Sequence, residues 1–184
     1  MRRYTGGLFY LIGGALAGTL SAYAMVEHTG IQMLGTNSPW QSRIAALEGA
    51  TGIYVASSYL LAGRLPLAPG QLVEASAEAD NDGEMLTASC TYEITSTGPL
   101  PRWWSVAVLN PGGSATSDQA ALDSGMTVYE PDGSVHITAA AIPVPGNWLK
   151  VEASRRFTLL YAALPGSGRA AMIAPPFAIT RKGC

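Results

Sequence analysis

Residues 73–94, VEASAEADNDGEMLTASCTYEI, alternate apolar and polar side chains on either side of a polar turn. The apolar positions are Val73, Ala75, Ala77 and Ala79 before the turn, and Leu86, Ala88, Cys90, Tyr92 and Ile94 after it. A period of two is typical of a β-strand with one buried face. The stretch between the two runs holds Asp, Asn and Gly, which are the residues of tight turns. These features together predict a β-hairpin.

Further strands are predicted at 103–109, 126–129, 134–141, 157–163 and 177–180, and PDGS at 131–134 predicts another tight turn. Short strands that are separated by Gly and Pro, with no helix between them, are typical of all-β domains. We therefore expect a mainly β protein. Residues 64–184 are expected to form a jelly-roll-like, antiparallel β-sandwich.

Residues 4–26 carry no charge and predict a transmembrane helix, because ~20 apolar residues span the bilayer core. Arg2 and Arg3 lie in the short stub 1–3, and the next Lys or Arg in the sequence is Arg43. The positive-inside rule then leaves the stub in the cytoplasm and exports the rest of the chain. The alternative is a cleaved signal peptide, because AYA at 22–24 has the form of a cleavage site and cleavage near Ala24 would release the domain.

One face of the predicted transmembrane helix carries Gly14, Gly18 and Ala22. Small residues at this spacing let two helix backbones approach closely. This face predicts a homodimer or a second envelope protein as a partner within the bilayer. A segment rich in Gly and Ala also produces the same spacing by chance, so both explanations stay open.

After an irregular linker over 27–37, residues 38–63 predict an amphipathic helix. Ser38 can cap it, Pro39 suits its first position, and Gln41 completes a capping box. Its apolar face would consist of Trp40, Ile44, Leu47, Thr51, Tyr54, Ser58 and Leu61. The uncharged part of this segment is too short to span a bilayer, so we expect the helix to dock on the following domain.

The 184 residues contain two cysteines, Cys90 and Cys184. An exported domain lies in a compartment that permits disulfides, and two cysteines allow one pairing within the chain. We therefore expect a Cys90–Cys184 bond that ties the C-terminal end to the core. In the alternative, Cys90 is a small buried apolar residue and Cys184 is a free thiol.

The composition excludes some functions. Charged residues make up 13% of the chain and the net charge is −2, with no cluster of Lys and Arg to bind nucleic acid. The two histidines have no zinc-ligand spacing, and the order of Asp80, Asp82 and Gly83 departs from a calcium loop. The sequence predicts no metal, no cofactor and no catalytic residue. A hydrolase is the weakest alternative, because it would need His136 to reach a nucleophile.

The adjacent Trp103 and Trp104 must point to opposite sides of a strand. Together with Trp148, Asn147 and Arg102, they are candidates for a groove that binds a small amphipathic or carbohydrate ligand. Packing is the alternative explanation for these tryptophans. In that case we expect the outer ring of the pair to be covered by the helix at 38–63.

Five segments carry a resemblance to a known family: EADNDGEMLTASCTYEITSTGPLPRWWSVAVLN, EPDGSVHI, GNWLKV, FTLLYAALP and APPFAITR. In this order, from about Leu65 to Cys184, the chain resembles domain-of-unknown-function family 1214. The resemblance implies a bacterial, β-rich protein and supplies no catalytic residue. Larger members of the family carry a second domain before this one, where the present sequence has its apolar segment and linker.

Together these observations predict a protein of the bacterial inner membrane, with its amino terminus in the cytoplasm and a periplasmic β-sandwich. If the apolar segment is cleaved near Ala24, the protein is periplasmic instead. We expect a structural or interaction module of the cell envelope, whose partners include the lipid bilayer. A ligand-binding protein is the alternative.

Overall fold

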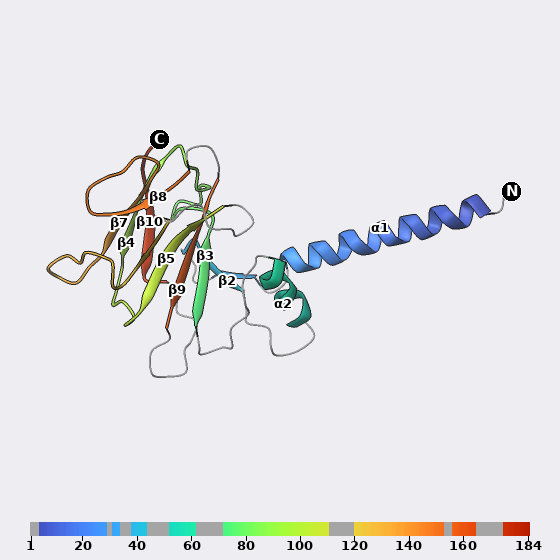
Figure 1. The fold of residues 1–184 in the computed structure, drawn as a ribbon, viewed down its shortest axis with the longest axis horizontal. Helices are drawn as coiled ribbons and strands as arrows, with labels where there is room; N and C mark the ends of the chain where they lie inside the picture. The colour runs from blue at the N-terminus through green and yellow to red at the C-terminus, as the bar shows by residue number, and fades with distance from the viewer. Residues whose placement is uncertain are drawn as a thin grey trace.

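The computed structural model describes residues 4–28, 31–33, 38–43, 52–61, 72–110, 120–152, 156–164 and 175–184. Within these residues two β-sheets pack face to face, and a long helix projects away from them (Figure 1). The prediction of a mainly β protein is confirmed.

The larger sheet has six strands in the order β1-β2-β3-β9-β5-β6, and every neighbouring pair is antiparallel. Its strands are β1 (Ile31–Met33), β2 (Trp40–Arg43), β3 (Val73–Ala77), β9 (Thr158–Ala163), β5 (Trp104–Leu109) and β6 (Ala121–Asp123). The smaller sheet has the order β10-β4-β7-β8, with β10 (Phe177–Gly183), β4 (Thr91–Ser96), β7 (His136–Ala140) and β8 (Asn147–Lys150). Because β7 and β8 run parallel, the expectation of a purely antiparallel sandwich was wrong for this pair.

One apolar core lies between the sheets and takes alternate side chains from both. Aromatic rings join the two layers: the centroid of the Trp104 ring lies 5.1 Å from that of Phe177, and Tyr161 lies 5.9 Å from Phe177. Trp40 extends the cluster, because its ring centroid lies 6.1 Å from that of Tyr161. Burial of such large rings contributes strongly to the stability of a core.

The predicted hairpin at 73–94 was wrong in its pairing, although its alternation of buried and exposed residues is confirmed. β3 pairs with β2 and β9, whereas β4 pairs with β10 and β7 in the other sheet. The tight turn itself is present, since the Gly83 amide donates to the Asp80 carbonyl and Gly83 has a φ of 83°. A period of two identifies the buried face of a strand, but it leaves the partner strand open.

The helix expected at 38–63 was wrong at its start. Trp40–Arg43 is the strand β2, residues 44–51 lie outside the described residues, and the helix α2 is Gly52–Leu61. Trp40 is completely buried, and its indole N–H donates to the Phe177 carbonyl at 2.7 Å. Capping signals are local and worth about 1 kcal/mol, so burial of a tryptophan ring between the sheets outweighs them.

Two further differences concern the loops. Residues 126–129 were expected to form a strand, but the strand of this region is β6, at 121–123, and residues 127–130 are irregular. In the linker expected at 27–37, the N-terminal helix continues to His28 and residues 31–33 form β1. The PDGS turn is confirmed by the hydrogen bond from the Gly133 amide to the Glu130 carbonyl.

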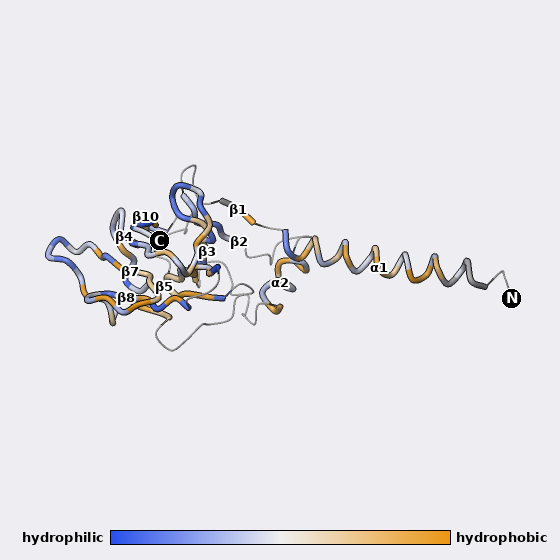
Figure 2. Tube along the Cα trace, turned by 90° about the horizontal axis from the view of Figure 1, so that it is seen from above, coloured by the Kyte–Doolittle hydropathy of each residue, from blue (hydrophilic) through white to orange (hydrophobic). Residues whose placement is uncertain are grey.

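The N-terminal helix α1 (Tyr4–His28) projects from the sandwich (Figure 2), and its large apolar residues from Phe9 to Met25 are exposed. From Phe9 to His28 it is long and apolar enough to cross a membrane, a property that signal sequences share. The short helix α2 contacts α1, and its Val55 and Tyr59 are buried.

Side chains from the 80–90 segment hold β10, which is an edge strand. Cys90 is bonded to Cys184, in agreement with the predicted pairing. Asn81 exchanges two hydrogen bonds with the Ile179 backbone, one from its amide and one to its side-chain oxygen. The buried Asp80 pairs with Arg181 at 3.2 Å and accepts the backbone N–H groups of two residues of its own turn.

We predict that Cys184→Ser lowers the melting temperature by several degrees. A native disulfide typically contributes about 2–4 kcal/mol, and a chain of this size shifts by about 2–4 °C per kcal/mol. Thermal unfolding without reductant measures the difference. As a control, reductant should lower the melting temperature of the unmodified protein to that of the variant and leave the variant unchanged. Equal melting temperatures without reductant would contradict the role of the bond.

Asp80→Ala removes the buried partner of Arg181 and the acceptor of two N–H groups. We expect a loss of about 2–4 kcal/mol in the free energy of unfolding. Asp82→Ala, two residues away at an exposed position, is the matched control and should change it by about 0.5 kcal/mol or less. Urea unfolding of both variants provides the measurement, and similar midpoints would show that the Asp80 cluster does not hold the turn against β10.

Candidate functional site

The structure places the adjacent tryptophans on opposite sides of the larger sheet. Trp104 is completely buried in the core, whereas 37% of Trp103 is exposed, and Arg102 beside it is exposed as well. Trp103 is thus partly covered, and its expected cover by the helix at 38–63 stays a prediction, because residues 44–51 and 62–63 lie outside the described residues. α2 packs elsewhere, since Tyr59 lies against β2 and β3.

Asn147 and Trp148 lie on β8, in the other sheet. The Asn147 side chain is occupied by the backbone: its oxygen accepts the Val128 amide at 2.7 Å, and its nitrogen donates to the carbonyls of Val128 and His136. It therefore holds the irregular segment at 127–130 against β8. The Trp148 indole N–H donates to the Ala140 carbonyl at 3.0 Å, and its ring is half-buried. The five groove candidates do not come together at one site.

Trp148 belongs instead to a polar row across the outer face of the smaller sheet. The strand registers bring Thr180, Glu93, Thr138 and Trp148 next to one another, one from each strand. The residues before and after Glu93 and Thr138 in their strands point into the core instead, so the row lies on the outer face. The row is thus a strip of hydroxyl and carboxylate groups that ends at an aromatic ring.

Two basic side chains, Lys182 and His136, contact Glu93 on this face. Lys182 Nζ lies 2.5 Å from one carboxylate oxygen of Glu93, and His136 Nδ1 lies 3.4 Å from the other. The hydrogen bond from Lys182 lowers the pKa of Glu93, and His136 adds to the shift. Such a solvent-exposed ion group contributes little to stability. Among the described residues the imidazole of His136 contacts the carboxylate of Glu93 rather than a nucleophilic hydroxyl. This arrangement gives the hydrolase hypothesis no support.

The described residues also line three hollows. One of about 390 Å³ lies beside the turn at 80–83 and carries Gln41, Glu78 and Asp82 on its wall. Another, of about 160 Å³, lies beside the disulfide and is lined by Ala88, Ile142 and small neighbours. No group of three His, Cys, Asp or Glu side chains in the described part of the chain is arranged to hold a metal ion.

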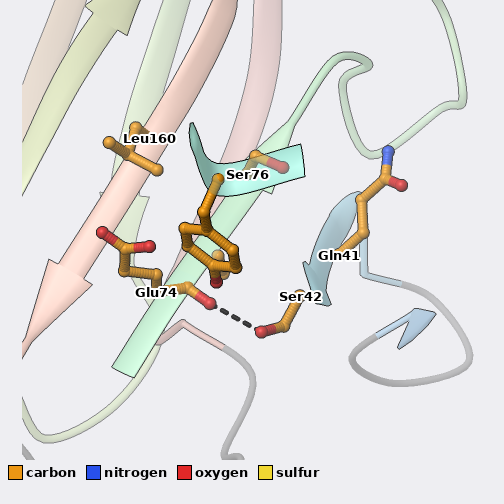
Figure 3. Close-up of a pocket in the computed structure, with 7 residues that line it drawn as sticks. Gln41, Ser42, Glu74, Ser76 and Leu160 are labelled. Atoms are coloured by element: carbon orange, nitrogen blue, oxygen red, sulfur yellow. Dashed lines mark hydrogen bonds between the residues drawn. The ribbon is translucent and has the colours of Figure 1, made fainter. Parts of the chain in front are cut away.

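The third hollow, of about 30 Å³, lies at the seam between α2 and the larger sheet, and Figure 3 shows its lining. Tyr59 of α2 meets side chains of three strands there, among them Glu74, Ser76 and Leu160. The Ser42 hydroxyl donates to the Glu74 carbonyl at 2.7 Å and joins β2 to β3 (Figure 3). A space of this size holds about one water molecule, so it is a packing seam rather than a ligand site.

Sequence reasoning missed the Glu93–Lys182 pair, the Asp80–Arg181 pair and the contact of Tyr59. Glu93 and His136 both occupy outward positions of predicted strands, which is the one signal that could have suggested a shared face. Their adjacency depends on the pairing of β4 with β7, and the sequence pattern does not specify this pairing.

Two of the solved structures that resemble the chain are described below. A protein from Vibrio parahaemolyticus matches with a TM-score of 0.56 and 18% identity, covering 91% of this chain and 44% of its own. A protein from Burkholderia cenocepacia matches with a TM-score of 0.46 and 22% identity, covering 61% of this chain and 29% of its own. The first likeness shows a shared fold, and the chain spans less than half the length of either protein.

No curated protein matches the chain. A family model does match it: the model of the proteins of unknown function called DUF1214 covers residues 71–165, from just before β3 to just past β9. This is just over half of the 184 residues. Four of the five segments that suggested this family lie within the matched range, and the fifth, at 174–181, lies beyond it. The chain belongs to the DUF1214 family of proteins of unknown function.

Proposed function

We propose that this protein is a membrane-anchored component of the bacterial cell envelope, with a jelly-roll-like β-sandwich that acts in the periplasm as a structural or interaction module. One observation carries the proposal: α1 is uncharged from Tyr4 to Val26 and no part of its apolar stretch is buried in the protein. An apolar helix of this length needs a solvent other than water, and a bilayer supplies it.

Two further features support export. The Cys90–Cys184 bond suits an oxidising compartment such as the periplasm. Arg2 and Arg3 precede the uncharged segment, which favours a cytoplasmic amino terminus. Both arguments hold for a retained anchor, and both also hold for a signal peptide that is removed after export.

The connection between α1 and the sandwich supports a retained anchor. The segment that follows α1 is part of the fold, since β2 pairs with β3 and Trp40 fills the core. A helix that continues into such a segment can hold the sandwich at a fixed place beside the membrane. The face with Gly14, Gly18 and Ala22 lies on exposed helix, and a Cβ added at either glycine would meet no atom within 4 Å apart from the backbone of the helix itself. Association with a second membrane helix through this face stays a prediction.

We predict that a reporter enzyme fused after Cys184 is active only when it is outside the cytoplasm, and that the full chain stays in the membrane pellet after alkaline carbonate washing. Alkaline phosphatase and β-galactosidase fusions with opposite compartment requirements serve as paired controls. Active β-galactosidase fusions would reverse the orientation. An intact mass that begins at Met25, with the protein in the soluble fraction, would replace the anchor by a signal peptide.

A second candidate function is binding of a carbohydrate or small amphipathic ligand on the outer face of the smaller sheet. The observation that favours it is the row from Thr180 to Trp148, where an aromatic ring adjoins hydroxyl and charged groups. Aromatic rings supply apolar contact area, and the polar row supplies hydrogen-bond partners.

For this candidate, we expect soluble oligosaccharides such as cellohexaose or chitohexaose to quench the tryptophan emission of the full-length protein in detergent. Trp148→Ala should abolish the saturable change. Trp103→Ala, which removes an exposed ring from the other sheet, is the matched control and should retain it. Loss of the signal in both variants, or in neither, would count against a site on this sheet face.

A further inference from the structure

The helix α2 (Gly52–Leu61) is apolar on two opposite faces. Val55 and Tyr59 are 1% and 8% exposed and lie one turn apart on one face. Ile53, Leu60 and Leu61 are 76%, 65% and 70% exposed. Positions seven and eight residues apart lie on the same face of a helix, so the three exposed side chains form a second apolar strip, away from Val55 and Tyr59.

The inner face already has its partner. Tyr59 meets Glu74, Ser76 and Leu160 on the outer side of the larger sheet, at the seam drawn in Figure 3. The sandwich therefore cannot cover the strip of Ile53, Leu60 and Leu61, which points the other way. An exposed apolar strip of this kind is typical of a surface that binds a partner or a membrane.

The position of α2 in the molecule indicates which partner can cover its exposed apolar strip. α2 contacts α1 and lies beside the C-terminal end of α1, where the chain leaves the long apolar helix (Figure 1). In both views it runs across the line of α1 rather than along it. If α1 spans a bilayer, the end of α1 marks the membrane surface, and a helix that crosses this end lies in the plane of that surface.

The chemistry of α2 fits this location. Its sequence, GIYVASSYLL, contains no charged residue, so no ionised group has to leave water when the strip enters the boundary between headgroups and acyl chains. Ile53, Leu60 and Leu61 supply the apolar area that interfacial helices bury. The helix that α2 contacts, α1, also has an exposed apolar surface.

We propose that α2 is an interfacial helix: Ile53, Leu60 and Leu61 insert into the surface of the lipid bilayer, while Val55 and Tyr59 hold the sandwich. This inference rests on the proposed membrane anchor. It adds a second point of attachment, which fixes the larger sheet toward the lipid surface and leaves the outer face of the smaller sheet turned away from it.

The test uses the full-length protein in phospholipid vesicles, with one fluorescent nitrobenzoxadiazole label on an introduced cysteine. The two native cysteines are bonded to each other, so the new thiol is the one that reacts. Ile53→Cys and Leu60→Cys report on the strip, and Leu16→Cys reports on the middle of α1. Asp132→Cys, in the loop before β7 that lies far from α1 in Figure 1, is the matched exposed control.

Vesicles carry lipids with a nitroxide quencher either near the glycerol backbone or near the end of the acyl chain. We expect labels at positions 53 and 60 to be quenched several-fold more than the label at 132, and more by the shallow quencher than by the deep one. The label at position 16 should show the opposite depth preference. An unchanged disulfide by intact mass and an unchanged tryptophan emission confirm that each variant is folded.

Three outcomes overturn the inference, and they differ from one another. If position 16 is quenched but positions 53 and 60 behave like 132, the anchor stands and the interfacial helix is wrong. If position 16 is not quenched, the anchor itself fails. If the labels on the strip show blue-shifted emission that lipid quenchers leave unchanged and that depends on the protein-to-lipid ratio, a second copy of the chain covers the strip.

Discussion

The edge strand β10 depends on side chains from the 80–90 segment, and the closure of the sandwich depends on β10. An edge strand has a row of unpaired backbone groups, and it frays or recruits another chain unless something holds it. Here Asn81 occupies part of that backbone row at Ile179, and Asp80 holds Arg181 through a buried carboxylate. The bond between Cys90 and Cys184 fixes the end of the strand. Each contact joins residues about 95 to 100 positions apart in the chain.

The same strand connects the core to the segment that follows α1. Phe177, at the start of β10, packs against Trp104 and Tyr161 and accepts the indole N–H of Trp40. Trp40 lies in β2, twelve residues after His28, the last residue of α1. A strand that follows α1, β2, is thus bound to the last strand of the chain, β10.

The candidate binding face and the proposed membrane face lie on different sheets. α2 covers part of the larger sheet at Tyr59, whereas the row from Thr180 to Trp148 lies on the smaller one. This separation is compatible with both proposals, because attachment of the larger sheet to a bilayer would leave the outer face of the smaller sheet exposed. Membership in the DUF1214 family adds a shared fold for residues 71–165 and assigns no activity.

The sequence by itself determined the features that depend on residues close together in the chain, and the cysteine pairing, for which two cysteines leave one choice. These are the alternating burial from Leu86 to Ile94, the turns at 80–83 and 131–134, the long uncharged helix and the single possible cysteine pair. Only the tertiary structure decided which strands pair, that Trp40 belongs to a strand, and that β8 runs parallel to β7. It also separated Trp103 from Trp148 and brought Glu93 to Lys182. The physical reason is that periodicity and capping report on one segment at a time, whereas strand partners are chosen by the burial of the whole core.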